Sequence, residues 1–314
     1  MALGLGIVVY WATQSGPAAA IISAFKSRVI ADGGTVESPS CAKSDVKFLL
    51  DNPAPSTYDA DYQAVLDRST ALGYTAPSPA QQTLQNTLVT DLKTAGVWDK
   101  LDVFYVFATD GDSNFATLNW KAPSSHQVTK VSSPTFTADS GFSGDGSTAY
   151  LDTNFSIAND ATNYTQNNAS AFTYFVSDLS QTDFVAYGAR NDVDPNKVRN
   201  QLRMRSTDYR PAINDDRPII AADYRSNNWH HQKRTTSTGF TTFLDSTSFT
   251  NTISSKDISD LDFSMRLLTL HFKTTGGTSN LFASAEGTMK VFGLGEALDN
   301  TDLKDAIDTY ISAL

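Results

Sequence analysis

From about residue 115 onward, the chain consists of short runs in which apolar and polar residues alternate, separated by clusters of Gly, Pro, Asn, Asp and Ser. Successive side chains of a β-strand point to opposite faces of a sheet, so this alternation predicts strands with one buried face. Several such strands at short intervals, with turn residues between them, are typical of an antiparallel sandwich. The clearest runs are 172–176, 184–187, 202–205, 240–244, 266–272 and 288–292.

The acidic residues favour the same kind of fold. Among 34 acidic residues, only Glu37, Glu286 and Glu296 are glutamates, and the others are aspartates. Asp is favoured in turns and helix caps, whereas Glu is favoured in helix interiors, so many turns are expected. The formal net charge of −10 argues against a general affinity for nucleic acid or for an anionic membrane.

The part of the chain before residue 100 carries a helical pattern instead. Apolar residues recur at helical spacing in 18–30, and a second, weaker helix is predicted for 42–50. A third helix is predicted for 58–72, where Gly73 ends it.

A fourth helix is predicted to begin at Ser78-Pro79-Ala80-Gln81. Serine at the cap, proline at the first position and glutamine at the third form a capping box. Residues 100–109 are aromatic and β-branched, and either a buried strand or a last helix fits so short a run. A final helix is predicted after Asp299-Asn300, with its apolar residues on one face.

These patterns predict an α+β protein, in which a small, mostly helical N-terminal region (1–114) precedes an antiparallel β-sandwich, or jelly roll, with a C-terminal helix (115–314). The apolar residues 1–10 are too few to span a bilayer and lack the positive charges of a signal peptide. We expect them to form a strand or a docking segment that meets a partner surface, without membrane insertion. Cys41 is the single cysteine and is expected to be a small buried residue.

Four stretches of the second half resemble, in order, the strands of concanavalin A-like, laminin-G-like jelly rolls. This resemblance covers roughly residues 118–298 and implies a lectin-like sandwich. The hairpin turn at Asp245-Ser246 departs from the Asp-Gly of the family pattern, so its turn type is expected to differ. The matching stretches are Gly141 to Asp152, Ser170 to Val176, Asn228-Trp229-His230-His231 with Phe243-Leu244-Asp245, and Glu286 to Leu298.

The whole chain also resembles virion proteins of tailed phages. The likeness is carried by Phe25 to Glu37, and by Leu101 to Pro123 ahead of the jelly roll. It implies a structural protein located in the virion, whose partners are other virion proteins and copies of itself.

The best candidate for a recognition surface is the segment 190–234, which holds ten basic and six acidic residues, a local net charge of +4 in an acidic chain. Arginine and aromatic residues are favoured at interfaces. The surface could meet an anionic glycan or the acidic face of a neighbouring copy, or the arginines could pair internally on exposed strands. The predicted binding residues are Arg199, Arg203, Arg205, Tyr209, Arg210, Tyr224, Arg225 and Trp229.

No set of catalytic residues is evident in the sequence. A retaining glycosidase needs two carboxylates about 5–5.5 Å apart, whereas Glu286 and Glu296 are ten positions apart. His230 and His231 are adjacent, and adjacent strand residues point to opposite faces, so a shared metal is not expected. We expect one of them to be buried beside Trp229 and the other to face water.

Two Asp-rich loops offer oxygen ligands for calcium at alternate positions, at 110–114 and 191–196. Neither has the glutamate of an EF-hand at its twelfth position, because Lys121 and Arg203 stand there. Solvated turns are the alternative, so no cofactor is predicted and calcium is left open.

The leading hypothesis is a non-enzymatic phage virion structural protein, docked by its N-terminal region and displaying or packing a lectin-like sandwich. The alternative is a glycan-binding module that recognises a host surface, and the third hypothesis is a polysaccharide hydrolase.

Overall fold

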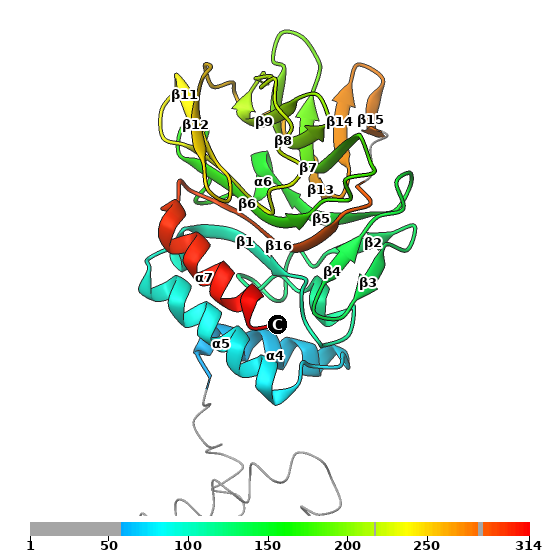
Figure 1. Cartoon of the computed structure of the whole chain (residues 1–314), viewed down its shortest axis with the longest axis vertical. Coiled ribbons are helices and arrows are strands. Elements are labelled where there is room, and N and C mark those ends of the chain that lie inside the picture. The colour runs from blue at the N-terminus through cyan, green and yellow to red at the C-terminus, as the bar shows by residue number, and fades with distance from the viewer. Residues whose placement is uncertain (1–57, 217, 282–284) are drawn as a thin grey trace, which may run out of the picture. The chain divides into compact units, whose positions relative to one another are not determined.

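A computed structural model describes residues 58–216, 218–281 and 285–314. The predicted docking segment 1–10, the predicted helices 18–30 and 42–50, and Cys41 lie outside these residues. The rest of the chain, Tyr58–Leu314, is one compact unit. As predicted, it combines helices near both ends with two packed sheets built almost entirely of antiparallel strands (Figure 1).

The first sheet, sheet A, has the strand order β12-β11-β10-β6-β16-β4-β3, with β1 also paired to β16. Its strands are β1 (Leu101–Val106), β3 (Thr135–Thr137), β4 (Gly141–Ser143), β6 (Ala169–Val176), β10 (Trp229–Arg234), β11 (Gly239–Phe243), β12 (Ser248–Thr252) and β16 (Thr288–Gly295).

The second sheet, sheet B, has the order β15-β14-β7-β13-β5-β2, and β8 joins β7 to β9. The pairing of β14 with β7 is parallel. Its strands are β2 (Thr129–Val131), β5 (Tyr150–Ser156), β7 (Asp183–Asn191), β8 (Val198–Arg205), β9 (Tyr209–Asp215), β13 (Ser264–Leu267), β14 (Leu270–Thr274) and β15 (Gly277–Leu281).

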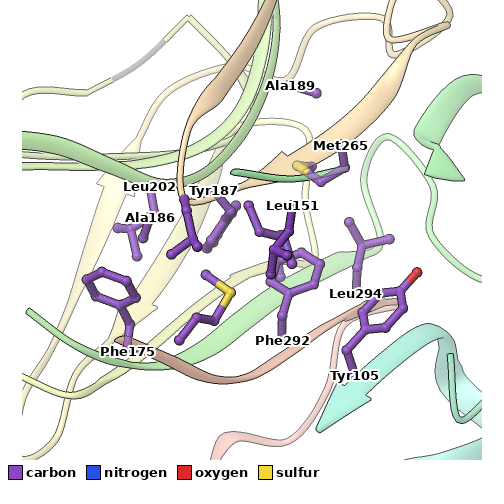
Figure 2. Packing of buried hydrophobic residues seen from close by; sticks show 14 of the residues in the cluster. Tyr105, Leu151, Phe175, Ala186, Tyr187, Ala189, Leu202, Met265, Phe292 and Leu294 are labelled. Atoms are coloured by element: carbon purple, nitrogen blue, oxygen red, sulfur yellow. The ribbon is translucent and has the colours of Figure 1, made fainter. Parts of the chain in front are cut away.

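The main hydrophobic core lies between the two sheets (Figure 2). Phe175 of β6 and Phe292 of β16 face Phe184 and Tyr187 of β7, and the two contacting ring pairs lie 5.7 and 5.1 Å apart between centroids. Aromatic pairs at such spacings add to the stabilisation from burial. Further members of this core are Tyr105, Leu151, Ala186, Ala189, Leu202, Met265 and Leu294.

A second core lies on the other face of sheet A, where the helices pack (Figure 1). β1 serves both cores, because Val103 and Tyr105 point toward sheet B while Phe104 and Val106 point toward the helices. A strand buried on both faces is apolar throughout, which explains why 100–109 shows no alternation. The helices are α4 (Ala60–Leu72), α5 (Pro79–Thr94) and α7 (Asn300–Ser312), and the short ones are η1 (Trp98–Lys100), η2 (Phe115–Thr117) and α6 (Ile157–Asp160).

The ends of the helices follow the predicted signals. α4 ends at Gly73, which adopts the left-handed conformation (φ 70°) that glycine accepts without strain. At α5, the side-chain oxygen of Ser78 accepts the N–H of Gln81 at 3.3 Å. The reciprocal half of the capping box does not form, because the N–H of Ser78 donates to Asp110 instead.

Two sequence predictions are corrected by the strand pairing. The predicted strand 266–272 is two strands, β13 and β14, because Leu268 interrupts it with a positive φ of 65°. The predicted boundary after residue 114 falls inside the compact unit, since β1 precedes it and is a strand of sheet A. The helices α4 and α5 therefore belong to the same unit as the sandwich.

Candidate functional site

The predicted arginines of β8 and β9 lie on the face of sheet B that points away from the core. Arg203 and Arg210 are register partners on these strands. The guanidinium of Arg203 donates two hydrogen bonds to Asp183, at 2.8 and 2.6 Å, and Arg205 contacts the same aspartate at 3.3 Å. Arg210 is paired with Asp208, which also accepts from Arg205 at 3.0 Å. These three arginines are thus bound to neighbouring carboxylates.

The remaining predicted arginines are also paired. Arg199, which is 7% exposed, bonds to Asp192 and Asp216. Arg225 is held by Asp223 and donates to the carbonyl oxygens of Leu179 and Gln181, at 3.0 and 2.8 Å, so it ties two loops together.

The pKa values of the partner aspartates reflect these contacts. Hydrogen bonds from Arg210 and Arg225 lower the pKa of Asp208 and of Asp223, respectively. The guanidinium groups of this surface are therefore already engaged by neighbouring carboxylates. Most of the predicted cations are structural partners rather than bare charges.

The predicted aromatic residues are placed elsewhere. Tyr209 is fully buried and packs against Tyr224 and Phe249. Trp229 is also fully buried, on the other face of sheet A beneath the helices. The structure therefore brings Arg203, Arg205 and Arg210 together, but it does not bring them to one concave site with Tyr224, Arg225 and Trp229.

Both adjacent histidines are buried, which corrects the expectation that one faces water. They do point to opposite faces of sheet A: His230 stacks on Tyr209 on the sheet B side, and His231 stacks on Phe243. Burial lowers the pKa of each histidine to about 4, so both are neutral at pH 7.

Aspartates of the two Asp-rich loops bond to neighbouring groups of the protein. Asp112 accepts the backbone N–H groups of Asn114, Phe115 and Thr75. Asp192 pairs with Arg190 and Arg199. Within the described ranges, no cluster of three or more His, Cys, Asp or Glu side chains is arranged to hold a metal ion.

The glutamate pair is far from the separation that a retaining glycosidase needs. Glu286 and Glu296 lie beyond opposite ends of β16, and its eight residues alone span about 26 Å. Eight aspartates of the described residues have a lowered pKa, whereas a general acid needs a raised pKa. These aspartates are Asp59, Asp112, Asp145, Asp178, Asp192, Asp208, Asp223 and Asp257.

Two hollows lie outside the predicted surface. One is a groove of about 410 Å³ between α5 and α7, whose acidic lining residues are Asp91, Asp302 and Asp305. The other, also about 410 Å³, is where the chain crosses from β2 to β3, and it contains Lys130 and Phe136. The second hollow could not be predicted from the sequence, because Lys130 meets its partners Ser113 and Asn114 only in the fold.

No protein-family model matches the chain, and no curated protein sequence is similar to it. Among solved structures, Trypanosoma rangeli sialidase in complex with sialic acid is 10% identical, with a TM-score of 0.43 over 74% of this chain and 39% of that one. The botulinum neurotoxin serotype D binding domain is 10% identical, with a TM-score of 0.40 over 68% of this chain and 52% of that one. This chain thus covers about half or less of these proteins, and likeness of this size does not indicate what it binds.

Among the described residues, no helix combines the length and the apolar character needed to cross a membrane.

Proposed function

We propose that this protein is a non-enzymatic structural protein of a tailed-phage virion, docked to the particle through its N-terminal residues. The sequence resemblance at Phe25 to Glu37 and at Leu101 to Pro123 supports the virion assignment. The apolar residues 1–10 supply a segment suited to burial against a partner.

The non-enzymatic role is supported by the way in which the charged side chains of this surface pair with one another. The arginines of β8 and β9 bind Asp183, Asp192 and Asp208, and the adjacent histidines are buried and neutral. Catalysis needs titratable groups that converge on a cleft with pKa values matched to proton transfer. Rigid pairing of charged groups instead suits a module that is displayed or packed between copies.

The test is whether the protein is part of intact particles. Purified virions are separated by mass, probed with an antibody against the sandwich, and imaged with the same antibody on gold. We expect a constant number of copies per particle at one location. Absence of the chain from purified virions would overturn the proposal.

A glycan-binding role is the alternative, and for the segment 190–234 it required arginines and aromatics that converge. Tyr209 and Trp229 are fully buried, and Arg225 is bonded to Asp223 and to two backbone carbonyls. Glycan binding therefore calls for a different part of the surface.

A further inference from the structure

The hollow beside β2 combines a cation, hydroxyl groups and an aromatic ring. It lies between the loop that contains Ser113 and the corner at which the chain passes from sheet B to sheet A. Its volume of about 410 Å³ is in the range of small-molecule sites, which are concave and apolar with a few placed polar groups. Its lining residues are Ser113, Lys130, Ser133, Pro134, Phe136 and Phe142.

Lys130 differs from the arginines of sheet B in its partners. Its ammonium donates to Ser113 Oγ at 2.9 Å and to Asn114 Oδ1 at 2.8 Å, and both acceptors are neutral. The arginines Arg190, Arg199 and Arg203 bind carboxylates instead. An ammonium group has three N–H donors, so one donor and the full positive charge stay available. The two hydrogen bonds also fix the side chain in advance, which lowers the entropic cost of binding.

The wall of the hollow is apolar and aromatic. Phe136 is partly buried, and its ring lies 5.1 Å from that of the fully buried Phe142, which holds it in place. Pro134 extends this surface. A sugar ring presents C–H groups on its flat faces and hydroxyl groups at its edge, so it matches an aromatic wall that is flanked by serine hydroxyls.

The corner that forms the hollow is strained. Ser132 and Ser133 have φ values of 54° and 57°. Serine rarely adopts this conformation, which costs about 1–3 kcal/mol per residue. Backbone strain of this kind is often found at ligand-binding positions. Here the strained residue Ser133 lines the hollow.

We propose that this hollow binds a carboxylated sugar unit, such as a uronate residue of an acidic polysaccharide. The carboxylate meets the ammonium of Lys130, and the sugar ring packs on Phe136. The chain's net charge of −10 opposes a densely charged polyanion, so one carboxylate per sugar fits better than several sulfates. This site goes beyond the virion proposal and does not depend on it.

The test compares trigalacturonate with its neutral counterpart galactotriose, each titrated into the full chain by isothermal titration calorimetry. We expect the acidic sugar to bind about tenfold more tightly, because a charge-assisted hydrogen bond is added. Raising the salt concentration should reduce this difference.

Variants assign the binding to the hollow. Lys130→Met should reduce trigalacturonate affinity to that of galactotriose, and Lys130→Arg should restore part of the preference. Phe136→Ala should weaken both sugars by about tenfold, since the ring contact is common to both. Lys256→Met is the matched control, because Lys256 is exposed and lies in a loop bonded to Asn214, outside the hollow.

Equal affinity for the two sugars, or unchanged binding in the Lys130→Met variant, would overturn the proposal. So would the absence of binding by either sugar at about 10 mM, well above the dissociation constants of weak ligands. Displacement of trigalacturonate by acetate at the same carboxylate concentration would overturn it as well, because the sugar ring would then contribute nothing. Circular dichroism of each variant shows that a loss of binding is not a loss of fold. The proposal fails or stands independently of whether the chain is found in particles.

Discussion

A chain of hydrogen bonds connects the C-terminal helix to sheet A, and only one arrangement of protons satisfies it. The indole N–H of Trp229 can only donate, so its partner on Asn300 is the amide oxygen, at 3.0 Å. His231 Nδ1, also 3.0 Å from that oxygen, must then carry a proton. Its Nε2 accepts from Ser170 Oγ, which accepts in turn from the N–H of Leu298. His231 thus has a structural role, because it links α7 to β6.

The stability of the fold should fall as the pH drops from 6.5 toward 4. Burial lowers the pKa of His230 and of His231 to about 4 in the folded chain, against 6.5 for a free histidine. Above pH 6.5 both states are neutral, and below it only the unfolded chain takes up protons. The free energy of unfolding should then fall by up to about 1.4 kcal/mol per pH unit for each histidine.

Urea denaturation at pH 7.5, 6.0, 5.0 and 4.5 measures this dependence. His231→Gln should remove part of the slope, and His230→Gln a similar part, because burial lowers the pKa of both. Part of the slope should remain in each variant, since burial also lowers the pKa of His271. A free energy of unfolding that stays flat from pH 7 to pH 4.5 would contradict the assignment.

The ion pair of Arg234 with Asp215 should be among the most sensitive points of the fold. Both residues are fully buried, and the two side chains meet at 3.1 Å. Removal of one partner leaves a buried charge without compensation, so Asp215→Asn and Arg234→Met should each cost about 3–5 kcal/mol. The double variant should lose less than the sum of the two.

Denaturation of the three variants gives the coupling energy. Lys273→Met is the control, because Lys273 and its partner Asp262 are partly exposed and their pair should contribute less than about 1 kcal/mol. Purely additive losses would show that the two buried groups act independently.

Periodicity predicted most strands of the sandwich, including β6, β7 and β16, but left β1 undecided between strand and helix. β1 is apolar on both sides, because helices cover the face that does not meet sheet B, so its sequence alone could not separate strand from helix. The interruption between β13 and β14 occurs at Leu268, which has a positive φ. A leucine in the sequence gives no sign of such a backbone conformation. Half of the predicted capping box forms, at Ser78. The other half does not, because the side chain of Gln81 bonds to Asp139 and Thr109 instead.

The candidate site was harder to predict than the fold. Charge and aromatic content drew attention to 190–234, but strand register decides which carboxylate each arginine meets, and that register is set by pairings distant in sequence. Lys130 is one strand lysine among ordinary residues, and its neutral partners lie 16 and 17 positions earlier. That the Lys130 ammonium has neutral partners and can bind an anion follows from the tertiary fold alone.

The docking of α7 should depend on its first residue. Asn300→Leu leaves the buried N–H groups of Trp229 and His231 without an acceptor, and we expect a loss of about 2–4 kcal/mol. Hydrogen exchange should report faster opening of α7, whose buried residues include Leu303 and Ile307. Thr301→Ala, at the next and exposed position, should cost less than about 0.5 kcal/mol.

The helices complete the sandwich rather than stand apart from it. α4, α5 and α7 cover the face of sheet A that carries Phe172 and Trp229. Without them, this face would expose a large aromatic surface to water, which costs about 25 cal/mol per Å². The sandwich and its helical layer should therefore fold and unfold together.

Two truncations test this unity. A chain of residues 58–314 keeps the whole compact unit, so it should melt cooperatively within a few degrees of the full chain. A chain of residues 115–314, cut at the boundary that the sequence suggested, loses α4, α5 and the pairing of β1 with β16. It should fail to give a cooperative transition by circular dichroism and should be cleaved rapidly by protease. A cooperative melt of 115–314 would show that the sandwich is independent of its helices.

Under the virion proposal, 58–314 should stay folded yet be absent from particles, because it lacks the apolar residues 1–10.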